Sequence, residues 1–141
     1  MSRTCADPPS TLIPIVLAEP HPIARQALST LLQEDGELGV VATADLAGAL
    51  RAVAEHRAPV LIVSRGLLKG DPEGLSPLGP LPAATRTIVL GLQDDPAFGR
   101  EARRAGAAAY VVKDRADSEL LAQVDAQLVV AGLRTSWPLS A

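Results

Sequence analysis

Short apolar runs alternate with amphipathic stretches along most of the chain. Each run is four to seven residues long, is rich in Val, Ile, Leu or Ala, and is bounded by polar residues, Gly or Pro. Such runs are typical of strands that are buried on both faces of a parallel sheet. The sequence therefore predicts strands over residues 12–18, 38–43, 59–63, 87–90 and 108–112.

The segments between these runs favour helices, because their apolar residues recur three or four positions apart. Pro22 suits a first helical position, and Asp95 and Asp117 suit N-terminal caps. Helices are expected over residues 22–34, 45–57, 95–105 and 117–131. Strands that alternate with helices predict an α/β fold with a parallel sheet covered on both faces.

One connection departs from this alternation. Residues 66–84 contain four glycines and four prolines, which leave little helix. We expect a loop there with at most a turn or two of helix.

The 141 residues suffice for one hydrophobic core. Residues 1–11 contain two prolines and show no periodicity, and they are expected to form a disordered tail. Residues 12–131 then form one domain. We expect residues 132–141 to form a C-terminal tail or the start of a linker to a missing output domain.

Composition narrows the function classes. Hydrophobic residues make up 48% of the chain but aromatic residues only 2%, and the net charge is −3, so neither base stacking nor a basic surface for nucleic acid is expected. Cys5 is the single cysteine, which excludes an intrachain disulfide. No apolar run approaches the ~20 residues of a membrane span. We expect a cytoplasmic protein without membrane contacts.

Functional residues of an open parallel sheet gather at the carboxyl ends of the strands. The chain places Glu-Pro-His at 19–21, Ser-Arg at 64–65, Gly-Leu-Gln at 91–93 and Lys-Asp at 113–114. The segments that contain these ends read IVLAEPHPIARQAL, APVLIVSRG, TIVLGLQDD and AGAAAYVVKD. In that order and spacing they resemble the receiver domain of NarL-type bacterial response regulators over about residues 13–131. The resemblance implies a flavodoxin-like (βα)5 fold with strand order 2-1-3-4-5 and, here, a degraded third helix.

Receivers of this family carry two carboxylates after the first strand, a phosphorylatable Asp after the third, Ser or Thr after the fourth, and Lys after the fifth. This chain has Glu19 at the first acidic position but Pro20 at the second. Ser64 stands at the acceptor position and Gly91 at the hydroxyl position, and only Lys113 is retained. The resemblance also assigns Tyr110, three residues before Lys113, to the aromatic switch position.

These departures predict a degenerate phosphorylation pocket. Magnesium needs several oxygen ligands, and one carboxylate supplies too little negative charge. A serine hydroxyl cannot form the acyl phosphate and lacks an activating base. We expect a pseudo-receiver that is not an enzyme and has no catalytic residue, metal or cofactor.

Without a metal, Lys113 and Glu19 are expected to form an ion pair at neighbouring strand ends. Arg65 is a second cation that could reach Glu19. Alternatively, the aliphatic part of Lys113 only covers the strand ends.

Two catalytic interpretations are weak. Ser64 and His21 lack the first glycine of a nucleophile elbow and a carboxylate to orient the imidazole. The glycines at 66–79 match no phosphate-binding motif, although such a loop could cover a small ligand.

The expected function is regulatory and independent of phosphorylation, through a protein partner or a homodimer formed by the last helix, with transcription as the regulated process. Val129 and Val130 fall outside the buried stripe of that helix and could form the contact surface, or pack against residues 133–141. A domain that senses a small molecule in the vacated pocket is the alternative.

Overall fold

A computed structural model describes residues 12–68 and 84–133 of the chain. The strands are β1 (Ile13–Ala18), β2 (Leu38–Thr43), β3 (Val60–Ser64), β4 (Arg86–Gly91) and β5 (Ala109–Val112). The helices are α1 (Pro22–Gln33), α2 (Leu46–His56), α3 (Pro96–Arg104) and α4 (Ala116–Val130), with 3-10 turns η1 (Arg65–Leu68) and η3 (Lys113–Arg115).

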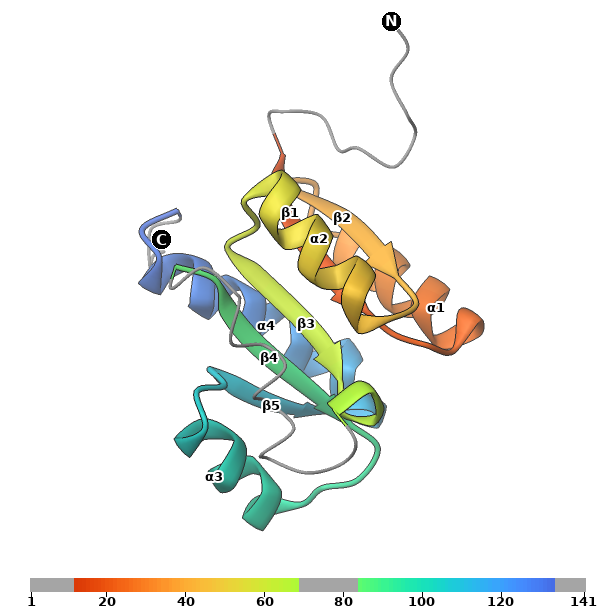
Figure 1. Cartoon of the computed structure of the whole chain (residues 1–141), viewed down its shortest axis with the longest axis vertical. Coiled ribbons are helices and arrows are strands. Elements are labelled where there is room, and N and C mark those ends of the chain that lie inside the picture. Colours follow the sequence, from red (N-terminus) through yellow and green to blue (C-terminus); the bar gives the residue numbers. More distant parts are fainter. Residues whose placement is uncertain (1–11, 69–83, 134–141) are drawn as a thin grey trace, which may run out of the picture.

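All strand pairs are parallel, and the order in the sheet is β2-β1-β3-β4-β5, as predicted (Figure 1). The chain therefore has the flavodoxin-like fold of a receiver. This order corrects one assumption: β3 and β4 lie between β1 and β5, so Glu19 and Lys113 do not follow neighbouring strands.

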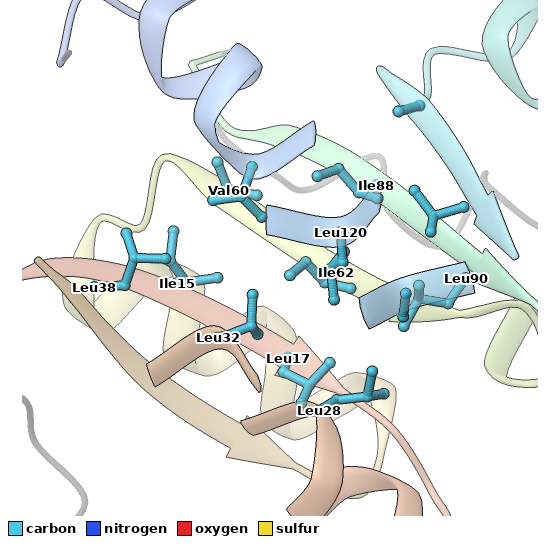
Figure 2. Close-up of a cluster of buried hydrophobic side chains, with 14 of the residues drawn as sticks. Ile15, Leu17, Leu28, Leu32, Leu38, Val60, Ile62, Ile88, Leu90 and Leu120 are labelled. Carbon is cyan, nitrogen blue, oxygen red and sulfur yellow. The ribbon is translucent and has the colours of Figure 1, made fainter. Parts of the chain in front are cut away.

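Helices cover both faces of the sheet, and each face has its own hydrophobic cluster. Figure 1 shows α2 in front of the sheet and α4 behind it. The cluster under α1 and α4 is aliphatic throughout and joins Leu17, Ile62 and Ile88 of the sheet to helix residues such as Leu32 and Leu120 (Figure 2). The cluster under α2 and α3 includes Phe98, the sole aromatic residue among the buried core residues of the described segments. Aliphatic side chains thus fill one layer completely and most of the other.

The last helix begins differently from the prediction. Asp117 was expected to cap it, but α4 starts at Ala116, directly after the 3-10 turn Lys113–Arg115, and Arg115 at the cap position makes no side-chain capping bond. Asp117 lies in the first turn, where its negative charge interacts favourably with the positive end of the helix dipole. The turn η3 leads from β5 directly into α4, so the helix begins without a side-chain cap.

The other boundaries agree with the prediction to within one or two residues. Asp95 is the N-cap of α3, as predicted, and its Oδ1 accepts a hydrogen bond from the Phe98 N–H at 3.0 Å. In the connection from β3 to β4, the described residues form the single turn η1. The remainder of the predicted loop, the predicted tail at 1–11, and residues 134–141 of the tail predicted over 132–141 lie outside the described residues.

Candidate functional site

A cavity of about 460 Å³ lies at the carboxyl ends of the strands. Four of the predicted pocket residues line it: Pro20, Ser64, Gly91 and Lys113. Glu19, the fifth, is fully buried at the end of β1. The remaining lining residues are His21, Arg65, Gly66, Leu90, Leu92, Gln93 and Asp95. The fold therefore gathers these strand ends around one cavity.

Glu19 and Lys113 form the predicted ion pair. The Lys113 Nζ atom lies 2.7 Å from Glu19 Oε1, and the side chains are 16% and 0% exposed, respectively. Because β3 and β4 separate the two strands, the lysine reaches across the ends of both. Glu19 Oε1 has no hydrogen bond of acceptable geometry with any described residue. Its contact with Lys113 is therefore an ion pair rather than a hydrogen bond.

The rest of the Glu19 environment comes from the start of α1. Its Oε2 accepts a hydrogen bond from the His21 backbone N–H at 3.1 Å. The Arg25 guanidinium donates to the Glu19 backbone carbonyl at 2.9 Å. Pro22 at the first turn of α1 fixes this approach of the chain. The carboxylate is thereby held between the N-cap residue of α1 and the first residue of η3.

The magnesium ion that the resemblance implies does not fit these residues. Pro20 offers no side-chain oxygen, and the carboxylates of Glu19 and Asp95 are each paired with a cation. Among residues 12–68 and 84–133, no three His, Cys, Asp or Glu side chains gather in a way that could hold a metal ion. A hard divalent cation would need more free oxygen ligands than this site supplies.

Ser64 is the last residue of β3 and only 4% exposed. It lines the cavity together with His21, but within the described segments no hydrogen bond joins the two side chains. The described residues therefore show no imidazole hydrogen-bonded to the hydroxyl that it would have to deprotonate.

Arg65 lies beside a second set of residues that the sequence did not reveal. Its guanidinium is 3.4 Å from Asp95 Oδ2 and lies 3.6 Å from the centre of the Phe98 ring. The Phe98 N–H and the Arg65 guanidinium hold the pKa of the Asp95 carboxyl below its ordinary value. The Asp-Pro pair at the start of α3 predicted the N-terminal cap. The position of the Arg65 guanidinium over the Phe98 ring depends on side-chain orientation, which the sequence does not reveal.

Tyr110 lies against the same cluster. Its hydroxyl donates a hydrogen bond to the Gln93 carbonyl at 2.9 Å. Its ring meets the Phe98 ring edge to face, with 5.2 Å between the centres and 63° between the planes. The predicted switch residue therefore spans from β5 to the connection between β4 and α3.

The predicted surface on the last helix is partly exposed. Val130 is 64% and Leu133 is 50% exposed, whereas Val129 is half-buried. In the part of the chain that the structure describes, no helix has the length and apolar character needed to cross a membrane.

Comparisons with known proteins agree with the fold and the resemblance. No protein-family model matches the chain. The oxygen regulatory protein NreC of Staphylococcus haemolyticus is 32% identical over 114 residues, which cover 78% of this chain and 52% of NreC. The NreC protein of Staphylococcus epidermidis is 31% identical over the same length. The chain thus spans about half the length of the curated relatives it matches.

Solved structures match the whole described fold. The receiver domain of the response regulator NarL from Mycobacterium tuberculosis superposes with a TM-score of 0.66 at 24% identity, covering 87% of this chain and 98% of that one. A two-component response regulator of the LuxR family from an Aurantimonas species gives 0.68 at 26% identity, covering 87% and 88%. Together with the strand order, these similarities show that the chain has the receiver-domain fold and is homologous to response regulators of the NarL/LuxR type.

Proposed function

We propose that this receiver is a pseudo-receiver, a regulatory module that works without aspartyl phosphorylation. The observation that carries the proposal is the buried ion pair between Glu19 and Lys113. In a phosphorylated receiver the carboxylates hold a metal ion, and the lysine meets the phosphoryl oxygens. Here the two surviving charges neutralise each other directly.

The acceptor position supports the same conclusion. Ser64 can form only a phosphoester, which does not have the ready reversibility of an acyl phosphate. Its hydroxyl also lacks a hydrogen-bonded base among the described residues, so nothing in the site raises its nucleophilicity. To contact a phosphoryl group, Lys113 would also have to leave the Glu19 carboxylate, which is fully buried. That carboxylate would then be an unpaired buried charge.

A direct chemical test is available. The protein, incubated with a small-molecule phosphodonor and Mg²⁺ and then weighed intact, should show no phosphoryl adduct. A NarL-type receiver that has the acceptor Asp, treated in parallel, should show one and thereby verify the donor. A stoichiometric phosphoryl adduct on this chain would refute the proposal.

The module is proposed to act in the cytoplasm through a protein partner or a homodimer, as part of a transcription regulator. A DNA-binding response regulator of the LuxR family from Staphylococcus aureus has the same fold, and NreC is an oxygen regulatory protein. The exposed apolar side chains of Val130 and Leu133, at the end of α4, support a contact surface on that helix.

A second candidate function is the sensing of a small molecule. The cavity of about 460 Å³ favours this role because polar residues such as Ser64 and Gln93 line it and can meet a bound molecule. A thermal-shift screen of small molecules separates the two candidates, because only a sensor would be stabilised by one of them. A ligand at 100 times its dissociation constant adds roughly 2.7 kcal/mol to the free energy of unfolding.

A further inference from the structure

Gly91, the last residue of β4, has no room for a side chain. A Cβ atom there would lie 1.8 Å from the Tyr110 hydroxyl oxygen and 2.5 Å from Cζ of the same ring, whereas real Cβ contacts below 3.0 Å essentially never occur. Because ring carbons take part in the overlap, turning the hydroxyl cannot relieve it. Glycine is required for space, since Gly91 is not among the described residues with a positive φ.

The contacts of Tyr110 hold its ring in this position. Its hydroxyl is bonded to the Gln93 carbonyl, two residues after Gly91. The Phe98 ring packs against the Tyr110 ring edge to face. Gly99 completes the enclosure, and there a Cβ would sit at an ordinary 3.6 Å from Tyr110 Cδ2. The ring therefore tolerates a methyl group at 99 but not at 91.

Phe98 is itself fixed from the candidate site. The Arg65 guanidinium lies over its ring at 3.6 Å and contacts Asp95, whose other oxygen caps α3 through the Phe98 N–H. Arg65 directly follows Ser64, the residue at the acceptor position. A continuous set of contacts thus leads from the end of β3, through Phe98, to Tyr110.

We propose that Gly91 and Tyr110 form a steric lock that holds the β4–α3 connection and the adjoining face of β5 in one arrangement without any modification at the strand ends. Position 91 carries Ser or Thr in the receivers that this chain resembles, and such a side chain cannot coexist with Tyr110 as it stands. The inference deepens the proposed function, because the lock supplies the fixed surface that a phosphorylation-independent module needs.

Tyr110 is the single tyrosine of the chain, so one fluorine label reports the lock directly. In protein containing 3-fluorotyrosine, the wild type should give one ¹⁹F resonance well separated from that of the urea-unfolded chain. Gly91→Ser should move the resonance most of the way toward the unfolded position, because the ring must swing out to solvent. Gly99→Ala, which touches the same ring without overlap, should leave the resonance in place.

A second measurement guards against a Gly91→Ser protein that simply fails to fold. Thermal unfolding should show that Gly91→Ser lowers Tm by several degrees in the Tyr110 background and by almost nothing in the Tyr110→Ala background. An unshifted resonance in Gly91→Ser, or an equal Tm loss in both backgrounds, would overturn the lock. Neither result bears on the phosphodonor assay, so failure of the lock and failure of the pseudo-receiver proposal are told apart.

Discussion

Glu19 places a carboxylate at the end of β1 where solvent does not reach it, and Lys113 lies beside it with 16% of its side chain exposed. A buried charge of this kind is tolerable only while its partner stays, because desolvation of a lone ion costs several kcal/mol. At the scale of single residues, the arrangement of the strand ends therefore depends on one lysine that reaches across β3 and β4.

Replacing this lysine should be costly. Lys113→Met is expected to lower the free energy of unfolding by about 3–5 kcal/mol, because it leaves Glu19 without its counter-charge. The double variant Glu19→Gln/Lys113→Met should recover much of the loss. Arg104→Met, which breaks the exposed pair between Arg104 and Glu101, is the matched control and should cost less than about 1 kcal/mol. Urea unfolding measures all of these, and equal losses for Lys113→Met and Arg104→Met would contradict the prediction.

Single residues also show what a sequence can and cannot predict. The pairing of Glu19 with Lys113 followed from charges at strand ends that the fold brings to one edge of the sheet, even though the two strands are not neighbours. The stacking of Arg65 on Phe98 and the fit of Tyr110 over Gly91 depend on rotamers chosen by packing. No spacing in the sequence encodes those choices.

At the scale of elements, the start of α3 is linked to the candidate site through the side chain of Asp95. Asp95 caps the helix, pairs with Arg65, and has a pKa below its ordinary value of 3.8. A carboxyl with a lowered folded-state pKa adds stability that is present above the ordinary value. This contribution is lost as the pH falls through the folded-state pKa.

The cap should therefore contribute to acid unfolding. Near neutral pH, the urea midpoint of unfolding should be higher for the wild type than for Asp95→Asn, because asparagine retains a capping oxygen but not the charge. The difference should shrink as the pH is lowered below about 4, where the Asp95 carboxylate begins to bind a proton. Midpoints measured across this range check the sign. A difference that is constant with pH would show that the charge of Asp95 is irrelevant to stability.

Other elements were predicted less well for reasons that lie outside local sequence. Asp117 had the residue type of an N-cap, but the turn Lys113–Arg115 continues directly into α4 and makes a side-chain cap unnecessary. Several strand ends differ from the prediction by one residue, because pairing with neighbours, rather than composition, decides where a strand stops. Periodicity was sufficient for the type and order of the elements.

At the scale of the whole molecule, the two layers of helices leave few large apolar side chains in solvent. Among the described residues, those with large exposed fractions are Ile23, Leu92, Val130 and Leu133. Val130 is the last residue of α4 and Leu133 follows shortly after it, where the proposed contact surface lies, whereas Ile23 lies at the start of α1.

The proposed surface gives a testable expectation for association. The wild-type chain should form dimers in sizing with light scattering, and Val130→Glu should shift them to monomers that still fold, because the side chain is 64% exposed. Ile23→Glu, at a side chain that is 85% exposed, is the control and should leave association unchanged. If Val130→Glu and Ile23→Glu act alike, the end of α4 is not the contact surface.

The position of Lys113 has one further consequence. It is the first residue of the turn that leads into α4, and α4 has 15 residues, which make a rod of about 22 Å. The rod runs from the cavity to Leu133 at the other end of the sheet. A ligand or partner that binds Lys113 in place of Glu19 would therefore act at the residue from which the chain turns into α4, at the opposite end of that helix from the proposed contact surface.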